Sequence, residues 1–334
     1  MASLFNRRIE VKIVTYSPST NQPLFESLFK NTMISVQLSK SRDFDVENTG
    51  VIGIKNISIE NTQSFTDVLN PFFLRYELRA GYGEESDFLP VISQGHIIET
   101  TWTHQGGDID LTFFISEGAK VLQLPYKLTQ ERLTLPPKSN VADFLKRLEA
   151  IGQEIDYIPN RSEVLNDLRK IQFQNTRTMA TGLRSALQYS LEEGGFRFFE
   201  ANGKITVQRR PDPSAPASYL FRNPNLATIL NFKTGMLSAD IENQYDYQKQ
   251  TRVAWVKFVA LFIPEIFPSN AIKINEPRYP HLEGNYIVDN VSIALNNKEG
   301  PFLSSGRALH FDYRHPDASN KTTIELEREA GIRF

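Results

Sequence analysis

The stretch that decides the fold runs from Ala271 to Tyr313, AIKINEPRYPHLEGNYIVDNVSIALNNKEGPFLSSGRALHFDY. It predicts three strands separated by turns. The middle strand begins at Gly284 and ends near Leu295, a polar turn follows, and the last strand runs from Phe302 to Phe311. Because an isolated two-stranded hairpin is only marginally stable in water, we expect this unit to belong to a larger sheet.

The N-terminal third of the sequence contains a similar succession of strands. Several segments match in the same order along the chain, which favours one fold that occurs twice. Any antiparallel strand pair that opens on a glycine gives a comparable short alignment, so a single matched pair leaves this alternative open. The matched pairs are Val51–Ile57 with Val253–Val259, Arg75–Ala80 with Ala271–Asn275, and Gln94–Trp102 with Glu283–Val291, aligned on Gly95 and Gly284.

The first third of the chain is dominated by alternating patterns. Apolar side chains occupy every second position in several runs, which is typical of strands with one dry and one wet face. Gly, Asn, Asp and Ser separate the runs, so we expect an antiparallel sandwich or barrel, with a helical turn at Ser64–Leu69. The runs are Ile9, Val11 and Ile13; Ile34, Val36 and Leu38; Ile52 and Ile54; Leu74, Tyr76, Leu78 and Ala80; and Ile109, Leu111, Phe113 and Ile115.

A different periodicity follows, and it predicts a compact α/β module. Apolar residues from Val141 to Ile151 fall on one helical face, and Gly152 is placed to end that helix. Asn202 and Gly203 supply the positive φ values of a tight hairpin turn. The other predicted elements are a helix from Thr178 to the Glu192-Glu193-Gly194-Gly195 end, short strands at Ile155–Ile158 and Ile171–Phe173, and a hairpin at Phe196–Val207.

These patterns together predict a mainly β (α+β) chain of three domains. Residues 1–128 and 213–334 form two related antiparallel β-barrels, and residues 129–212 form the α/β module between them. The proline-rich segment Pro211–Pro216 is expected to be a stiff linker.

Composition limits the classes of function. A chain of 334 residues with 40% apolar residues can bury two or three ordinary cores in water. A net charge of -2 gives neither a basic nucleic-acid footprint nor an adhesive membrane face. The absence of cysteine excludes disulfides and thiolate chemistry. The most apolar stretch, Trp255–Ile263, carries Lys257 and stops at Pro264, so membrane insertion by this chain is not expected.

We find no metal or cofactor motif in the sequence. The histidines are scattered and form no His-x-x-x-His pair, so they are interpreted as ordinary strand and loop residues. No metal site and no cofactor are predicted. The histidines are His96, His104, His281, His310 and His315.

Segments that could carry catalysis also have simpler interpretations. Glu84–Asp87 lacks the alternating spacing of a calcium loop, and Glu192-Glu193 ends a helix. Gly81–Gly83 and Gly194-Gly195 lack the residues that follow in a phosphate-binding loop. Ser304–Gly306 lies in a strand without a placed base. No catalytic residue is therefore predicted, and the chain is not expected to be an enzyme.

Two alternative functions remain open at this point. A cell-wall glycosidase would use carboxylates such as Glu192 or Glu99 as acid and base. A carbohydrate-binding adhesin would use Trp102 and Trp255 as stacking platforms. Core or interface aromatics at matched places in the two repeats are the favoured interpretation of these tryptophans.

The order of several motifs resembles the baseplate hub proteins of contractile phage tails, which are related to the hub part of secretion-system spike proteins. Each motif alone is degenerate, but together they cover most of the chain. The motifs of the first tube-like domain are Val51–Ile57, Leu78–Tyr82 and Val91–Ile97, and the later ones are the helix from Thr178, Gly194–Phe196, Asn202–Val207, Pro264–Pro268 and Leu282–Val288.

This resemblance implies two tail-tube-like barrels per chain and a homotrimer, so that three chains give a pseudo-sixfold ring. Such a hub joins the hexameric tail tube protein to the trimeric central spike protein, and it contacts other baseplate proteins and the tape measure protein. The ring surrounds the channel through which DNA passes transiently and without sequence specificity. The implied location is the virion tail baseplate, assembled in the host cytoplasm.

The sequence departs from some relatives of this kind. Secretion-system proteins continue from the hub into a β-helical needle, whereas this sequence ends soon after Tyr313, so spike and lysozyme domains are expected to be separate chains. The segment Thr322–Gly331 either docks on a neighbour or frays. A tail tube or distal tail protein is the nearest alternative function, and a non-contractile tail remains open.

Overall fold

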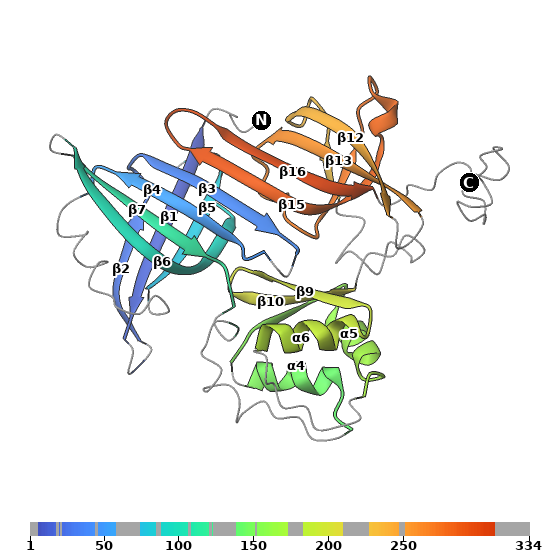
Figure 1. Ribbon diagram of the computed structural model, residues 1–334. Helices are drawn as coiled ribbons and strands as arrows, with labels where there is room; N and C mark the ends of the chain where they lie inside the picture. Colours follow the sequence, from blue (N-terminus) through green and yellow to red (C-terminus); the bar gives the residue numbers. More distant parts are fainter. Residues whose placement is uncertain are drawn as a thin grey trace.

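In a computed structural model, the chain forms one large sheet with a smaller α/β module beneath it (Figure 1). The structure describes residues 6–17, 20, 22–43, 46–57, 74–84, 88–105, 108–119, 122, 138–150, 152–172, 183–209, 227–246 and 251–310.

The first β unit contains every alternating run that the sequence predicted. In β3 the burial of side chains alternates strictly, because Ile34, Val36 and Leu38 face the core and the residues between them face solvent. The unit also contains one strand that the patterns did not predict, β2, whose apolar residues Leu24 and Leu28 are exposed. Its strands are β1 (Arg7–Tyr16), β2 (Pro23–Phe29), β3 (Ile34–Ser41), β4 (Thr49–Lys55), β5 (Leu74–Tyr82), β6 (Val91–Gln105) and β7 (Asp108–Ser116).

The second β unit is built around the stretch that opens the sequence analysis. The predicted strands at 271–275, 284–295 and 302–311 are confirmed as β14, β15 and β16, although His310 is the last described residue of β16. The unit consists of β11 (Thr228–Leu230), β12 (Met236–Asp246), β13 (Thr251–Leu261), β14 (Ala271–Ile274), β15 (Gly284–Asn296) and β16 (Phe302–His310), with a short 3-10 helix, η4 (Pro280–Leu282).

Strand pairing shows that five strands of each unit share one topology. In the first unit the antiparallel order is β3-β4-β7-β6-β5, and in the second it is β12-β13-β16-β15-β14. Both hairpins also carry a bulge on the first strand, between Ile97 and Glu99 in β6 and between Val288 and Asn290 in β15. The prediction that one fold occurs twice is confirmed for these five strands. Beyond them the units differ, because β1 pairs antiparallel with β5 whereas β11 pairs parallel with β14.

The residue alignment of the repeats needs a correction. When the repeats are aligned on their bulges instead of their glycines, Gly95 is equivalent to Tyr286 and no longer to Gly284. The match therefore moves by two residues. The face of each side chain is unchanged by an even shift, because side chains in a strand alternate with period two. The match of Arg75 with Ala271 is confirmed, since Arg75 pairs with His96 and Ala271 with Ile287.

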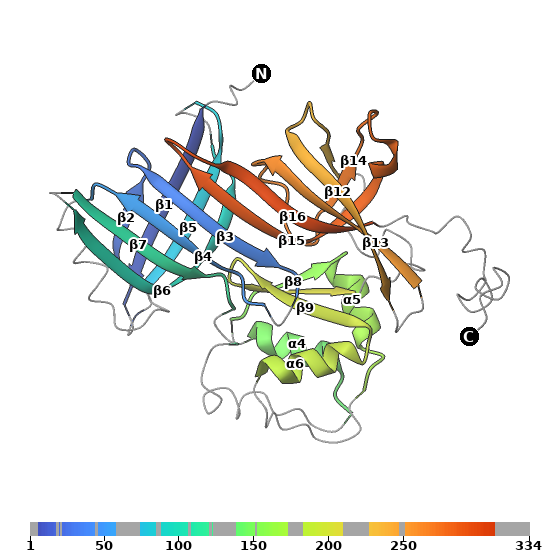
Figure 2. The ribbon, with the colours of Figure 1, turned by 45° about the horizontal axis from the view of Figure 1, so that its top comes forward.

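The two units are joined edge to edge into one 13-stranded sheet. Strand β3 of the first unit pairs antiparallel with the second half of β15, from Asn290↔Ser41 to Asn296↔Ser35. Apolar side chains from both units form a single buried cluster. Figures 1 and 2 show β3 and β15 side by side at the centre of this sheet.

The α/β module has its own sheet and its own core. Its sheet has the order β8-β10-β9, with β8 parallel to β10. Helices α4 and α6 lie on the side of this sheet away from the large sheet (Figures 1 and 2). The elements are α4 (Val141–Ala150), β8 (Ile155–Ile158), α5 (Arg161–Leu168), α6 (Leu183–Glu192), β9 (Phe196–Ala201) and β10 (Lys204–Arg209).

Most predictions for this module are confirmed. Gly152 ends α4 with a φ of 87°, and Asn202 and Gly203 make the hairpin turn with φ of 54° and 73°. Of the strand predicted at 171–173, Gln172 makes an isolated antiparallel bridge with Asn140, and Phe173 lies outside the described residues. Helix α5 was missed because its apolar residues, Val164, Leu165 and Leu168, are too few for a clear helical period.

Several predictions fall outside the described residues. These are the helical turn at Ser64–Leu69, the start of the second helix at Thr178, the linker Pro211–Pro216, the tail Thr322–Gly331, and the domain limits at residues 128 and 212.

Candidate functional site

The four histidines that the structure describes do not gather at one place. His96 and His104 lie on β6, where His104 makes an edge-to-face contact with Trp102 at a ring distance of 5.0 Å. His281 lies in η4, and His310 ends β16 against Tyr286. His315 lies outside the described residues. In the part of the chain that the structure describes, three or more metal-binding side chains do not come together.

The segments considered for catalysis lie in different parts of the fold. Glu192 ends α6 in the module, whereas Glu99 lies on β6 of the first β unit. Ser304 is fully buried in β16, and Gly81 continues β5. Residues 85–87 of the acidic turn lie outside the described residues. None of the described helices is long and apolar enough to cross a membrane.

The two tryptophans are not at matched places, which corrects the sequence interpretation. Trp102 lies on β6, whose counterpart is β15, and Trp255 lies on β13, whose counterpart is β4. Trp255 is half-buried beneath the guanidinium of Arg307, which lies 4.1 Å from its ring centroid. Trp102 is 49% exposed.

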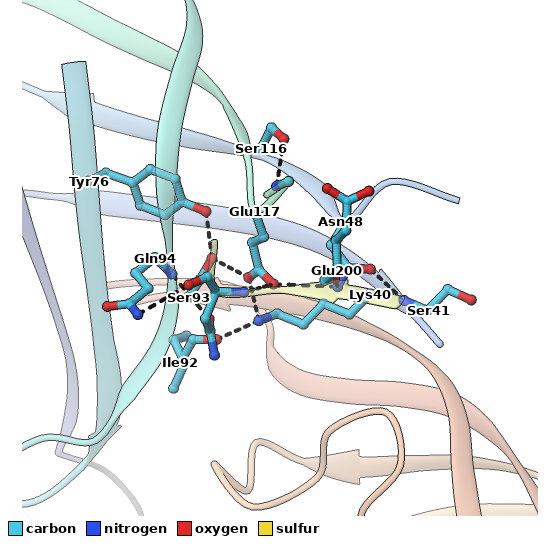
Figure 3. Close-up of polar contacts among 12 residues, drawn as sticks. Lys40, Ser41, Asn48, Tyr76, Ile92, Ser93, Gln94, Ser116, Glu117 and Glu200 are labelled. Atoms are coloured by element: carbon cyan, nitrogen blue, oxygen red, sulfur yellow. Dashed lines mark hydrogen bonds and ion pairs between the residues drawn. The ribbon is translucent and has the colours of Figure 1, made fainter. Parts of the chain in front are cut away.

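The most distinctive chemical feature is a buried polar junction where the module meets the first β unit (Figure 3). At its centre Lys40 Nζ lies 2.5 Å from Glu117 Oε1, and the side chains are 2% and 3% exposed. Ser93 Oγ donates to the same carboxylate at 2.5 Å, and the Tyr76 hydroxyl lies 2.7 Å from Ser93 Oγ. Lys40 Nζ also donates to the Ile92 carbonyl at 2.6 Å.

The module is connected to this junction through its β9–β10 hairpin. Asn48 Nδ2 donates to the Glu200 carbonyl at 2.6 Å, and the Gly203 N–H donates to the Glu117 carbonyl at 2.9 Å. The N–H of Gln94 in β6 donates to Asn202 Oδ1 at 3.2 Å. The hairpin turn therefore docks on three segments of the first β unit, which fixes the orientation of the module.

The same region also contacts the second β unit. Arg42 Nε donates to Asp289 Oδ1 at 3.0 Å, and the Arg42 N–H donates to the Asp289 carbonyl at 3.0 Å. Asp289 is the extra residue of the bulge in β15. Lys40 Nζ lies 4.7 Å from the Phe267 ring centroid. The junction thus touches all three parts of the chain.

Burial governs the electrostatics of the junction. Burial lowers the pKa of Lys40, and the neighbouring Glu117 carboxylate opposes that shift. Burial, together with the charge of Glu117, raises the pKa of Tyr76 well above its usual value. Because an unpaired charge is costly at such depth, the Lys40–Glu117 pair specifies how these strands meet. These contacts give the junction a role in holding parts together.

A signal for this junction was present in the sequence. Lys40 continues the inward alternation of Ile34, Val36 and Leu38, so a charge is placed where the strand faces the core. A lysine at an inward position requires a buried partner. Its partner, Glu117, is distant in sequence and could not be identified without the fold.

Glu200 gives a prediction for the pH dependence of stability. Burial raises its pKa to about 7, although Arg184 and the Ala119 N–H stabilise its charged form. The folded protein therefore keeps this proton between pH 4.5 and 7, where the unfolded chain releases it, and stability falls as the pH rises. We expect the free energy of unfolding, measured by urea unfolding, to fall by about 3 kcal/mol over this range. This fall should be absent in Glu200→Gln. An equal slope in both proteins would contradict it.

Comparisons with known proteins support the fold. No family model matches the chain, and no curated protein matches it. Solved structures do match. A 43 kDa tail protein of prophage MuSo2 from Shewanella oneidensis has a TM-score of 0.54 at 9% identity, covering 92% of this chain and 98% of that one. The tail protein from Neisseria meningitidis MC58 has a TM-score of 0.53 at 10% identity, covering 91% and 98%.

A third match comes from a secretion system. An Escherichia coli component of the type VI secretion system has a TM-score of 0.52 at 11% identity, covering 85% of this chain and 74% of that one. That protein is described as structurally similar to the bacteriophage T4 tail proteins gp27 and gp5. This chain has a fold similar to that of these tail and secretion-system proteins. The predicted resemblance to baseplate hubs is therefore confirmed at the level of fold.

Proposed function

We propose that this protein is the structural baseplate hub of a phage tail. In this proposal three copies form a pseudo-sixfold ring that joins the hexameric tail tube to the trimeric central spike and surrounds the DNA channel. The observation that carries the proposal is the occurrence of one β topology twice in the chain, with the two units paired edge to edge through β3 and β15. The likeness to tail proteins supports it.

The internal repeat explains how two symmetries can meet. A trimer of a chain with two equivalent units presents six units to a sixfold tube, while its own symmetry remains threefold. The buried junction at Lys40 and Glu117 supports the same role, because it holds the units and the module in one orientation. A rigid adapter needs such fixed angles between its parts.

The proposed partners follow from the same role. They are further copies of this chain, the tail tube protein, the central spike protein, other baseplate proteins and the tape measure protein. We propose no enzymatic activity and no sequence-specific contact with DNA. The proposed location is the tail baseplate of the virion, after assembly in the host cytoplasm. We retain the division at residues 1–128, 129–212 and 213–334 as part of this proposal.

Native mass spectrometry of the purified chain tests the proposal. We expect a trimer as the largest abundant species, because three copies with two units each supply the six units of the ring. Hexamers or stacked rings would instead favour a tail tube or distal tail protein, in which each copy supplies one subunit of a sixfold ring. If the chain stays monomeric at every protein concentration tested, the proposal that it forms a trimeric hub is contradicted.

A further inference from the structure

One edge of β15 is paired with β16, and the other edge is covered by two different strands in succession. The first half of this strand pairs with β14, from Ala271↔Ile287 to Ile274↔Gly284. The second half, after the bulge, pairs with β3 of the other unit. Its inward side chains are consequently buried, and Val291, Ile293 and Leu295 are at most 2% exposed.

The equivalent strand of the first unit, β6, has only half of this cover. Residues before its bulge pair with β5, as β15 pairs with β14. After the bulge, β7 is the partner on one side, and among the described strands none pairs on the other. The inward positions there are Thr100, Trp102 and His104, and all three are at least partly accessible, with Trp102 49% exposed.

Among the described strands, the matching edge of the second unit is also without a partner. Strand β12 is the counterpart of β3, and it ends the described sheet with β13 as its strand partner. Leu237 on β12 is 49% exposed, and Ile98 at the bulge of β6 is 51% exposed. In the described part of the chain, β6 therefore matches β15, and β12 matches β3, but neither has the partner strand that completes the β3–β15 joint.

The bulges give the equivalence of residues across the repeat. Positions directly paired in one unit correspond to positions directly paired in the other, so the register can be followed from strand to strand. The equivalent residues, taken outward from the bulge, are Ile97 and Val288, Ile115 and Ala308, Gly50 and Val256, and Leu38 and Ile241.

We propose that β12 of one copy pairs antiparallel with the second half of β6 of the next copy, in the register of the internal joint. Within the chain Ile293 lies opposite Leu38, and the corresponding residues are Trp102 and Ile241. The occupant of the open edge is thus a second copy of this chain. This inference rests on the proposed function, because the hub proposal sets the number of copies in the closed ring at three.

The residues brought together by this register are compatible. Trp102 meets Ile241 on the inward side, so two apolar side chains become covered. No two like charges lie directly opposite one another. The other facing pairs are Thr100 with Asn243, Thr101 with Glu242, Thr103 with Asp240, His104 with Ala239, and Gln105 with Ser238.

Pairing of these edges also removes a hazard. An open strand edge with exposed apolar side chains is a template for uncontrolled association. A repeated joint that closes on itself uses the β6 edge and the β12 edge of every copy once. The same contact within and between chains would place all units of the ring in equivalent orientations.

The absence of cysteine in this chain allows a direct test by disulfide formation. Facing residues of antiparallel strands have Cα atoms about 4.5–5.5 Å apart, which suits a disulfide. We expect Thr103→Cys with Asp240→Cys, both exposed, to give a covalent trimer on a non-reducing gel. The matched internal pair, Gln37→Cys with Ala294→Cys, should close within each monomer, since these residues are opposite in the structure.

A change of register supplies the negative control. In Thr103→Cys with Glu242→Cys both cysteines stay on the same face of the sheet, but the pair is shifted by two residues. In the proposed register their Cα atoms would be farther apart than the about 7 Å that a disulfide can bridge. Efficient cross-linking of the Thr103–Glu242 pair would overturn the proposed joint. So would a lack of cross-linking between Thr103 and Asp240 while the internal pair of Gln37 and Ala294 forms its disulfide. If native mass spectrometry still shows a trimer, the hub proposal survives that result. A covalent ladder that ends at six copies would confirm the joint and reject the hub.

Discussion

Replacement of Lys40 by methionine is expected to lower the free energy of unfolding by about 3–5 kcal/mol. The change leaves the Glu117 carboxylate buried without the ammonium that lies 2.5 Å away. Methionine fills a similar volume, so the loss is electrostatic and does not arise from a cavity. Urea unfolding at one fixed protomer concentration measures it, since oligomers make stability depend on concentration.

Two further variants isolate the cause. Lys12→Met removes a lysine from an exposed pair with Glu26, at 2.8 Å, and is expected to cost no more than about 1 kcal/mol. The double variant Lys40→Met with Glu117→Gln removes both charges and should recover part of the loss. Equal effects of Lys40→Met and Lys12→Met would show that the buried pair has no special role.

Replacement of Gly95 by alanine is expected to cost about 3 kcal/mol or to prevent folding. An added Cβ would lie 2.0 Å from the Ser116 carbonyl oxygen and 3.0 Å from the Glu117 Cα. Both atoms belong to the backbone, so no side chain can move aside. Gly95 lies three residues before Ile98, the extra residue of the bulge in β6, and next to Gln94, whose N–H donates to Asn202 of the module. Thermal unfolding followed by circular dichroism measures the effect.

A second glycine of the same β unit provides the control. In Gly81→Ala the new Cβ would meet the flexible end of the Leu89 side chain at 3.2 Å. That side chain can adjust, and the variant should stay within about 1 kcal/mol of the natural protein. If both alanine variants unfold alike, close backbone approach is not the reason that position 95 is glycine.

The local patterns predicted most strands because each buries one face. The runs in β1, β3, β4, β5 and β7 alternate clearly, since their inward side chains face a shared core. Strand β12 gave no such signal. Its sequence, MLSADIENQYD, is rich in polar residues, because it lies at the edge of the sheet.

The sequence also predicted the repeat, but not its residue register. Short alignments favour shared glycines, whereas the bulges and strand pairings fix which residues correspond. The polar junction was missed for a related reason. Its members Lys40, Asn48, Glu117 and Glu200 come from separate segments, and no spacing along the chain links them.

The order of alternating strands by itself determined that this protein is built from two β units and an α/β module. The period of apolar side chains is a local property, so it is visible in the sequence. Only the tertiary structure decided that β3 pairs with β15, that Lys40 meets Glu117, and that β6 and β12 are left as matching edges. These contacts join residues far apart in the chain, and their partners are selected by packing and burial in three dimensions.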